Sequence, residues 1–398
     1  MQADLPDFDA YPVIQRIRTA EPIDSGVGVV WDDGLEARYH VFWLRENAPD
    51  AETTHPVTRE QSLQLIDIPG DLAALSASPD ANGGLMVEWS TGERSVYHPG
   101  WLRAFTDGAP DPFELPTRRI WAGDLGDALP RFDGPLALMD EAVLEQWATA
   151  LHVHGVAILE GLPATPEVIE TVPERLGPIR VSNFGRVFDV RSKPDADSNA
   201  YTSMALPLHS DFFTREYAAG LQFLHCLENA ADGGESLLAD GFHIARVMKK
   251  REPELYDFLT HTPVSYCNKA KDTDYRWSAP MIGLDEGGEV KDVRWAPWLR
   301  APVRMPFEQT DTLYRALRTI FSLAEQPAHR VEVRLKPGDL LGFDNRRVLH
   351  GRTEFDPSTG NRWLRGCYVE REELESRLRI LARQRRQRQV QAEKGKRI

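Results

Sequence analysis

The sequence predicts a mainly β protein with flanking helices, in which a small N-terminal β-domain precedes a larger second domain. Short segments rich in β-branched and aromatic residues recur along the chain, separated by Gly, Asp and Pro turns. A stretch rich in these turn residues at 107–112 is typical of a linker. With 398 residues, the chain is long enough for two domains, which we place at 1–112 and 119–398.

The composition excludes several classes of protein. There are 47 basic against 61 acidic residues, so the net charge of −14 argues against general affinity for nucleic acid. No stretch approaches the ~18 apolar residues of a membrane-spanning helix, and acidic residues at 1–7 are unlike a signal peptide. Three widely spaced cysteines, Cys226, Cys267 and Cys367, favour reduced thiols in the cytoplasm over disulfides.

The N-terminal domain shows paired strand signals. Residues 27–31 predict a strand that ends in the Asp-Asp-Gly turn at 32–34, and 37–44 predict the strand that follows it. A second hairpin is expected from 84–89 and 93–98, which flank a Ser-Thr-Gly turn. These pairs indicate a domain built from short antiparallel strands.

The larger domain begins with helix signals and continues with strands. Apolar residues at helical spacing predict a helix at 140–152, and Thr165 followed by Pro166 favours the start of a second at 165–176. A buried strand is expected at 155–159. Farther along, the predicted elements are strands at 220–227, 330–335 and 340–343, a helix near 241–260, a loop-rich insert at 265–305 and a C-terminal helix from 370.

A candidate metal site is split between the middle and the end of the chain. His209 and Asp211 are two residues apart, so on an extended segment both side chains leave by the same face. His350, on a predicted strand, supplies a third ligand. Two imidazoles and one carboxylate on one face of a metal are typical of Fe(II) oxygenases. An isolated His-x-Asp pair is more often two solvated residues, and a similar pair, His152 and His154, lacks a third ligand and is read as structural.

A candidate anion clamp follows the third ligand. Arg362 and Tyr368 share parity on a predicted strand, so both point into one cavity if that face is inward. A fixed guanidinium beside a metal can hold a carboxylate through two parallel hydrogen bonds. Taken alone, Arg362 would be better explained by a surface ion pair.

Together these motifs resemble the taurine/clavaminate-type 2-oxoglutarate oxygenases, and most closely the γ-butyrobetaine dioxygenase-like members. The resemblance covers about residues 119–398, and a signature at Trp43–Asn47 extends it into the N-terminal domain. Besides the residues above, it rests on Gly233–Ser236, Asp344–Asn345, Leu349–Arg352, Leu221–Cys226, Asp240–Phe242 and Ser376–Leu381.

The resemblance implies a double-stranded β-helix, or jelly roll, that holds Fe(II) through His209, Asp211 and His350. It implies 2-oxoglutarate and O2 as cosubstrates, with Arg362 binding the far carboxylate of 2-oxoglutarate. The reaction would be hydroxylation of an unactivated C–H bond, with 2-oxoglutarate converted to succinate and CO2. The catalytic residues are thus expected to be the three metal ligands, and a homodimer is also implied.

The resemblance also implies an aromatic box for a trimethylammonium group. The matching positions are Phe184, Phe188, Tyr201 and Tyr368. A quaternary ammonium has no N–H to donate, so aromatic faces suit it. The alternative is that these aromatic residues are ordinary barrel core.

Departures from the family pattern fall at the substrate end and in the N-terminal domain. Ser198 and Phe212 stand at positions where the family has an amide and a tyrosine that receive the substrate carboxylate. The insert carries Arg294 and Arg300 in a region where the family has neutral amides. The N-terminal zinc ligands are replaced, so we expect no structural zinc; the positions are Ala48, Asp50, Thr53 and roughly Glu93.

The function expected from the resemblance is hydroxylation of a small trimethylammonium acid, with γ-butyrobetaine giving L-carnitine as the leading case. The extra arginines favour a more charged anion as an alternative, such as 2-(trimethylamino)ethylphosphonate. Two further alternatives are a protein hydroxylase, for which the N-terminal domain would be a docking module, and a non-catalytic barrel that binds a ligand. No nucleic acid or membrane partner is expected.

Overall fold

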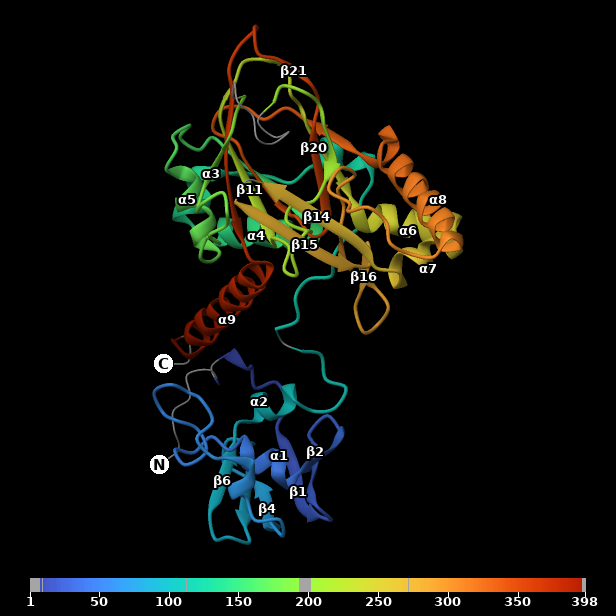
Figure 1. The fold of residues 1–398 in the computed structure, drawn as a ribbon. Helices are drawn as coiled ribbons and strands as arrows, with labels where there is room; N and C mark the ends of the chain where they lie inside the picture. The colour runs from blue at the N-terminus through green and yellow to red at the C-terminus, as the bar shows by residue number, and fades with distance from the viewer. Residues whose placement is uncertain (1–7, 9, 112, 193–201, 271, 396–398) are drawn as a thin grey trace. The chain divides into compact units, whose positions relative to one another are not determined.

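A computed structural model describes residues 8, 10–111, 113–192, 202–270 and 272–395. The chain separates into two compact units, one formed by 1–114 with 379–398 and the other by 115–378 (Figure 1). Strands with flanking helices make up both, as the sequence predicts. The domain bounds 1–112 and 119–398 stay a prediction.

Between residues 10 and 111, the smaller unit contains two three-stranded antiparallel sheets and two short α-helices. Trp31, Trp89 and Tyr97 are fully buried in its core. The expected strand at 37–44 is wrong in its second half, because the His40 side chain accepts a hydrogen bond from the Phe42 N–H and starts a helix there. The elements are β1 (Ile17–Ile23), β2 (Gly26–Trp31), β3 (Glu36–His40), α1 (Val41–Glu46), β4 (Ala74–Pro79), β5 (Leu85–Trp89), β6 (Arg94–Tyr97) and α2 (Pro99–Ala104).

Arg45, in the last turn of α1, contacts the loop that follows, which carries Asp50 and Thr53, two of the positions expected to have lost zinc ligands. Arg45 is 6% exposed and donates a hydrogen bond to the Thr53 hydroxyl. Its guanidinium also lies 3.7 Å from carboxylates of Asp50 and Glu52. The loop is therefore stabilised by charge-assisted contacts between protein groups, and the expectation of no zinc stays a prediction.

The larger unit is built on two sheets. The four-stranded sheet runs β10 (Leu206–His209), β20 (Val348–Arg352), β13 (Ser236–Asp240), β18 (Val331–Val333). The six-stranded sheet runs β7 (Arg131–Asp133), β8 (Val156–Glu160), β19 (Leu340–Asp344), β11 (Leu221–Asn229), β22 (Arg362–Val369), β9 (Phe188–Val190). All neighbouring strands are antiparallel except β7 and β8.

The two sheets share one apolar cluster, which shows that they pack face to face. Leu238 and Val348 of the four-stranded sheet belong to the same buried cluster as Leu224, Phe343 and Leu364 of the six-stranded sheet. Burying apolar surface between the sheets is what holds them together. The candidate site residues lie on the strands that meet across this interface.

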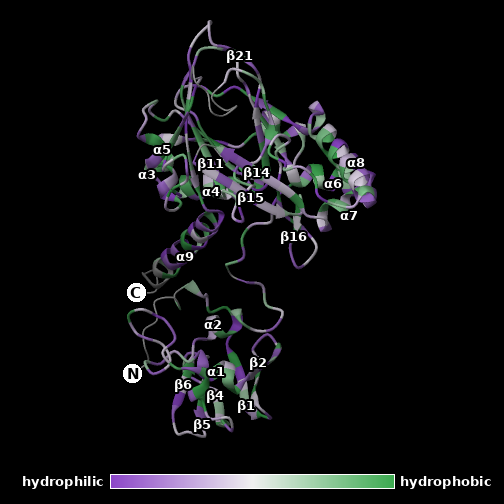
Figure 2. Cartoon of the chain, viewed as in Figure 1, coloured by the Kyte–Doolittle hydropathy of each residue, from purple (hydrophilic) through white to green (hydrophobic). Residues whose placement is uncertain are grey.

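Helices cover the outer faces of the sheets (Figure 1). On one side lie α3 (Gly134–Met139), α4 (Glu141–His154) and α5 (Val168–Thr171); on the other lie α6 (Gly241–Arg251), α7 (Pro253–His261) and α8 (Phe307–Ala324). The mostly hydrophilic α9 (Arg371–Gly395) follows β22 (Figure 2). No helix in the described ranges is long and apolar enough to cross a membrane.

Several sequence predictions need correction. The helix expected at 241–260 divides at Glu252, because Pro253 cannot continue it. The helix expected at 165–176 shrinks to α5 and a 3-10 turn that starts at Pro173. The insert at 265–305, predicted to be loop-rich, contains two hairpins. The sequence did not predict α8, which follows the insert. The hairpins are β14 (Val264–Ala270) with β15 (Thr273–Ala279), and β16 (Ile282–Leu284) with β17 (Val290–Val293).

Candidate active site

The three predicted metal ligands lie together at the edge of the four-stranded sheet. His209 pairs with His350 in the register of β10 and β20, and their ring centroids are 4.1 Å apart. Nε2 of His209 lies 3.4 Å from Oδ1 of Asp211, and Nε2 of His350 lies 3.8 Å from Oδ2. Among the described residues, these three form the one group of at least three His, Cys, Asp or Glu side chains whose possible ligand atoms all lie within 4.8 Å of one another.

The segment between the first two ligands differs from the expected extended geometry. β10 ends at His209, and Asp211 lies in a bend rather than on the strand. The Nδ1 atom of His209 is 2.9 Å from the Pro207 carbonyl, which fixes the ring and leaves Nε2 directed at Asp211. The side chains therefore converge through a bend and one hydrogen bond rather than through strand parity.

Asn345 holds the backbone of Asp211 in place. Its Oδ1 accepts from the Asp211 N–H at 2.6 Å, and its Nδ2 donates to the carbonyls of Asp211 and Ala219, each at 3.0 Å. Asn345 is completely buried. Because a buried amide bonds both the N–H and the carbonyl of Asp211, the carboxylate of this residue has a defined position.

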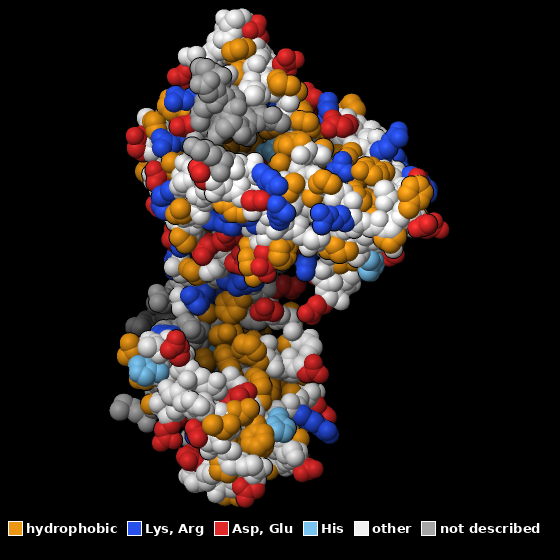
Figure 3. Space-filling model, viewed as in Figure 1, with side chains coloured by type: hydrophobic (Ala, Val, Ile, Leu, Met, Phe, Trp, Pro, Cys, Tyr) orange, Lys and Arg blue, Asp and Glu red, His pale blue; other side chains and the backbone are white. Residues whose placement is uncertain are grey.

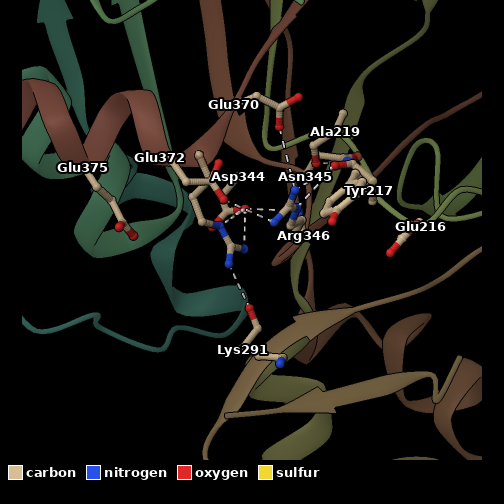
Figure 4. Close-up of polar contacts among 12 residues, drawn as sticks. Glu216, Tyr217, Ala219, Lys291, Asp344, Asn345, Arg346, Glu370, Glu372 and Glu375 are labelled. Carbon is tan, nitrogen blue, oxygen red and sulfur yellow. Dashed lines mark hydrogen bonds and ion pairs between the residues drawn. The ribbon is translucent and has the colours of Figure 1, made fainter. Parts of the chain in front are cut away.

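The residues flanking Asn345 tie the site to the start of α9. The Arg346 N–H donates to Asp344, and its guanidinium reaches Glu370 and the Ala218 carbonyl (Figure 4). Arg371 donates to the same Asp344 carboxylate at 2.8 Å. Asn345 is therefore fixed from both sides by ionic contacts.

The charges at the site suit a cation. Burial acts to raise the pKa of Asp211, but the hydrogen bond with His209, the adjacent His350 and the Tyr368 hydroxyl outweigh it and hold that pKa well below its usual range. Burial, together with the neighbouring His209, lowers the pKa of His350 to about 3. An ionised carboxylate beside a neutral imidazole is the state that binds a metal ion.

A cavity of about 160 Å³ opens beside these ligands and is lined by both sheets. One wall is aromatic: Phe184, Phe188, Phe212 and Tyr368 contact one another in a closed ring, with centroids 4.9–6.2 Å apart. The Tyr368 hydroxyl donates to Oδ2 of Asp211 at 2.8 Å. The wall thus adjoins the metal-ligand group.

Another wall of the cavity is cationic. Arg352 and Arg362 both lie over the Phe355 ring and are nearly buried. Nε of Arg362 donates to the Gly234 carbonyl at 3.2 Å, and within the described residues its guanidinium forms no ion pair. Burial, together with the charge of Arg352, lowers the pKa of Arg362 to about 10. A buried guanidinium in this situation favours an anionic ligand.

The structure brings most, but not all, of the predicted substrate residues to the cavity. Phe184, Phe188, Phe212 and Tyr368 line it, whereas Ser198 and Tyr201 lie outside the described residues. Arg294 does not line it, because its guanidinium donates to the backbone carbonyls of Arg215 and Glu216. The expectation that Arg294 binds substrate is therefore not supported.

Sequence reasoning missed several residues that line the cavity, among them Trp298, Gln222 and Asn268. The Trp298 ring lies 5.0 Å from that of His209, and no local motif marks it. Gln222 sits opposite Tyr368 in the β11–β22 pairing, so the parity that marked Tyr368 could have marked Gln222 as well.

Comparisons with known proteins define the class. Residues 122–368 match the model of the taurine catabolism dioxygenase TauD, TfdA family, and residues 20–103 match the γ-butyrobetaine hydroxylase-like N-terminal model. The γ-butyrobetaine dioxygenase of Pseudomonas sp. (strain AK-1) is 42% identical over 95% of this chain and 99% of its own. The trimethyllysine dioxygenase of Meyerozyma guilliermondii is 29% identical over 90% of this chain and 94% of its own.

Among solved structures, the non-haem iron oxygenase OrfP in complex with Fe and α-ketoglutaric acid aligns with a TM-score of 0.45 at 18% identity, covering 65% of this chain and 94% of that one. The family match covers more than half of the chain, so this protein belongs to the TauD/TfdA dioxygenase family. It is a non-haem Fe(II) dioxygenase that depends on 2-oxoglutarate.

The donor set fits Fe(II). Two imidazole nitrogens and a carboxylate converge on one side, and the cavity occupies the other, which is the facial arrangement of non-haem iron oxygenases. Neighbouring groups also orient the ligand side chains through hydrogen bonds. The Pro207 carbonyl orients His209, and Tyr368 and Asn345 orient Asp211. The roles of individual residues stay a prediction.

We expect Asn345→Ala to weaken Fe(II) binding about 10- to 100-fold, because outer contacts of this kind orient metal ligands. It should also lower the free energy of unfolding by about 1–3 kcal/mol, since three backbone groups lose their partner. Anaerobic calorimetry with Fe(II) checks the first result. Asn229→Ala is the matched control, because Asn229 also bonds a backbone carbonyl but does not line the cavity; equal loss in both variants would contradict the role of Asn345.

Proposed function

We propose that this protein hydroxylates γ-butyrobetaine to L-carnitine. One O2 and one 2-oxoglutarate are consumed, one oxygen atom enters the C–H bond, and succinate and CO2 are released. The observation that carries the proposal is the 42% identity to the Pseudomonas γ-butyrobetaine dioxygenase over 95% of this chain and nearly all of that one. The aromatic wall beside the metal-ligand group supports it.

In this proposal, His209, Asp211 and His350 hold Fe(II), which supplies O2 activation coupled to decarboxylation of 2-oxoglutarate. Asn345 and Tyr368 keep the Asp211 carboxylate in position for the metal. Arg362 binds the far carboxylate of 2-oxoglutarate. Its burial makes such a charge-assisted hydrogen bond stronger than it would be in water.

The substrate's trimethylammonium group is proposed to lie against Phe184, Phe188 and Tyr368. A quaternary ammonium on aromatic faces gains ~0.5–2 kcal/mol for each favourable contact. By the resemblance, Tyr201 belongs to the same aromatic box and Ser198 to the carboxylate end; both stay predictions, because they lie outside the described residues. Between its charged ends, γ-butyrobetaine exposes methylene groups, which the aromatic wall would place beside the metal ligands.

The alternatives have less support. The phosphonate hypothesis depended on Arg294 and Arg300, but both guanidiniums bind backbone carbonyls, and neither lines the cavity. A protein hydroxylase would not need an aromatic box beside the metal. A non-catalytic barrel would not need three converging ligands and a buried arginine at the same cavity.

We further propose that the two facing sheets form a double-stranded β-helix and that the protein acts as a homodimer in the cytoplasm. Unpaired thiols at Cys226, Cys267 and Cys367 agree with a reducing compartment. On the face shown in Figure 3, acidic and basic side chains intermingle, which does not favour nucleic acid.

Light scattering tests the proposed homodimer, and a molar mass near the 45.0 kDa of one chain would reject it.

Addition of γ-butyrobetaine to the enzyme with Fe(II), 2-oxoglutarate and O2 should release one succinate for each L-carnitine formed. Mass spectrometry and succinate quantification measure both products. The phosphonate analogue should be turned over more slowly, and His209→Ala should lose the reaction. The proposal fails if γ-butyrobetaine does not stimulate succinate formation, or if the phosphonate is clearly preferred.

Gly234→Ala should raise the KM for 2-oxoglutarate by roughly tenfold, the effect of losing ~1.4 kcal/mol of binding. Gly234 has a φ of +76°, and an added Cβ would lie 2.8 Å from Nε of Arg362. Gly288→Ala is the control, because Gly288 has a φ of +79° but nothing within 4 Å of its Cβ position. If both variants change the KM equally, backbone strain rather than Arg362 is responsible.

A further inference from the structure

Arg215 lies between two aromatic rings at the edge of the cavity. Its guanidinium carbon is 4.5 Å from the centroid of the Phe212 ring and 3.9 Å from that of Tyr275. Phe212 follows Asp211 directly, and Tyr275 comes from β15 of the insert. Phe212 itself lines the cavity. A positive charge is therefore held just behind the cavity wall.

Within the described residues, this charge is not neutralised by a carboxylate. Arg215 donates to the Asn183 side-chain carbonyl, and its Nε atom is buried without a hydrogen-bond partner. By contrast, Arg180, the other guanidinium over Phe212, forms an ion pair with Glu370 at 2.8 Å. A half-buried guanidinium lacking a counter-charge is costly unless a ligand supplies one.

Phe212 is held in an unusual backbone conformation. Its φ of +58° lies in the left-handed region, which a bulky side chain rarely adopts. The conformation lets one ring contact Phe184, Tyr368 and Arg215. Strain of this kind is retained where the surrounding structure requires it, and it often marks a functional position.

The arginines make the aromatic wall electrostatically asymmetric. Two guanidiniums lie over Phe212, at 4.5 and 5.9 Å from its centroid, so this ring is a poor place for a second cation. Phe188 and Tyr368 stack on each other with their ring centroids 5.1 Å apart. Because Phe212 already faces two guanidiniums, a zwitterion in the cavity gains most with its anion toward Phe212 and its cation away from that ring.

We propose that Arg215 is a specificity-determining residue that orients the substrate by supplying the counter-charge for its anionic end. The inference depends on the proposed function, since it concerns a substrate with a trimethylammonium group at one end and a carboxylate at the other. The resemblance already places the carboxylate at the Phe212 position, and Arg215 is the residue that supplies a positive charge there. This orientation decides which methylene group lies beside the three metal ligands.

The test compares γ-butyrobetaine with 4-(trimethylammonio)butan-1-ol, which keeps the cation but lacks the carboxylate. Dissociation constants are measured by calorimetry on enzyme loaded with Mn(II) and 2-oxoglutarate, so that the alcohol need not be a substrate. Arg215→Gln should weaken γ-butyrobetaine roughly tenfold and the alcohol less than about twofold. Arg215→Lys, which keeps the charge, should recover most of the affinity.

Arg276→Gln is the matched control, because Arg276 lies next to Tyr275 on β15 but pairs with exposed Asp274. It should leave both affinities unchanged. Unaltered alcohol binding by Arg215→Gln would show that the variant is folded. Equal weakening of both ligands, or of neither, overturns the role of Arg215 while leaving the proposed reaction in place; failure of the wild type to bind γ-butyrobetaine overturns both.

Discussion

The pairing of β10 with β20 is the constraint on which the site depends. It sets His209 directly opposite His350, although the two residues are far apart in the sequence. Two histidines on neighbouring strands can approach closely only in one register, since a shift of one residue turns a side chain to the other face. Asp211, in the bend after β10, then completes a cation site with no further chain movement.

The carboxylate ligand is fixed by the second sheet rather than by its own strand. Asn345 directly follows β19 and bonds both backbone groups of Asp211, while Tyr368 on β22 bonds its side chain. Since β19 and β22 both pair with β11, they form one rigid unit. Packing of the two sheets is therefore also what positions the metal ligands, which links stability to catalysis.

Different parts of the cavity suit anionic and cationic groups of a ligand. The arginine pair over Phe355 is buried and suits a dianion such as 2-oxoglutarate, whereas the aromatic ring group suits a quaternary ammonium. Arg215 places a third cation behind one part of that ring group. The placement of these charges therefore favours one orientation of a zwitterion in the cavity.

The sequence alone determined the ligand types, the strand that carries Arg362 and Tyr368, and the family, because these depend on local parity and short motifs. It could not determine that Asp211 lies in a bend, because a hydrogen bond to Asn345 from far along the chain decides this. It also misplaced Arg294 and overlooked Arg215, because Arg294 donates to the backbone carbonyls of Arg215 and Glu216, and Arg215 packs on Tyr275 of β15. Long-range packing, which no local pattern records, decided the substrate end of the site.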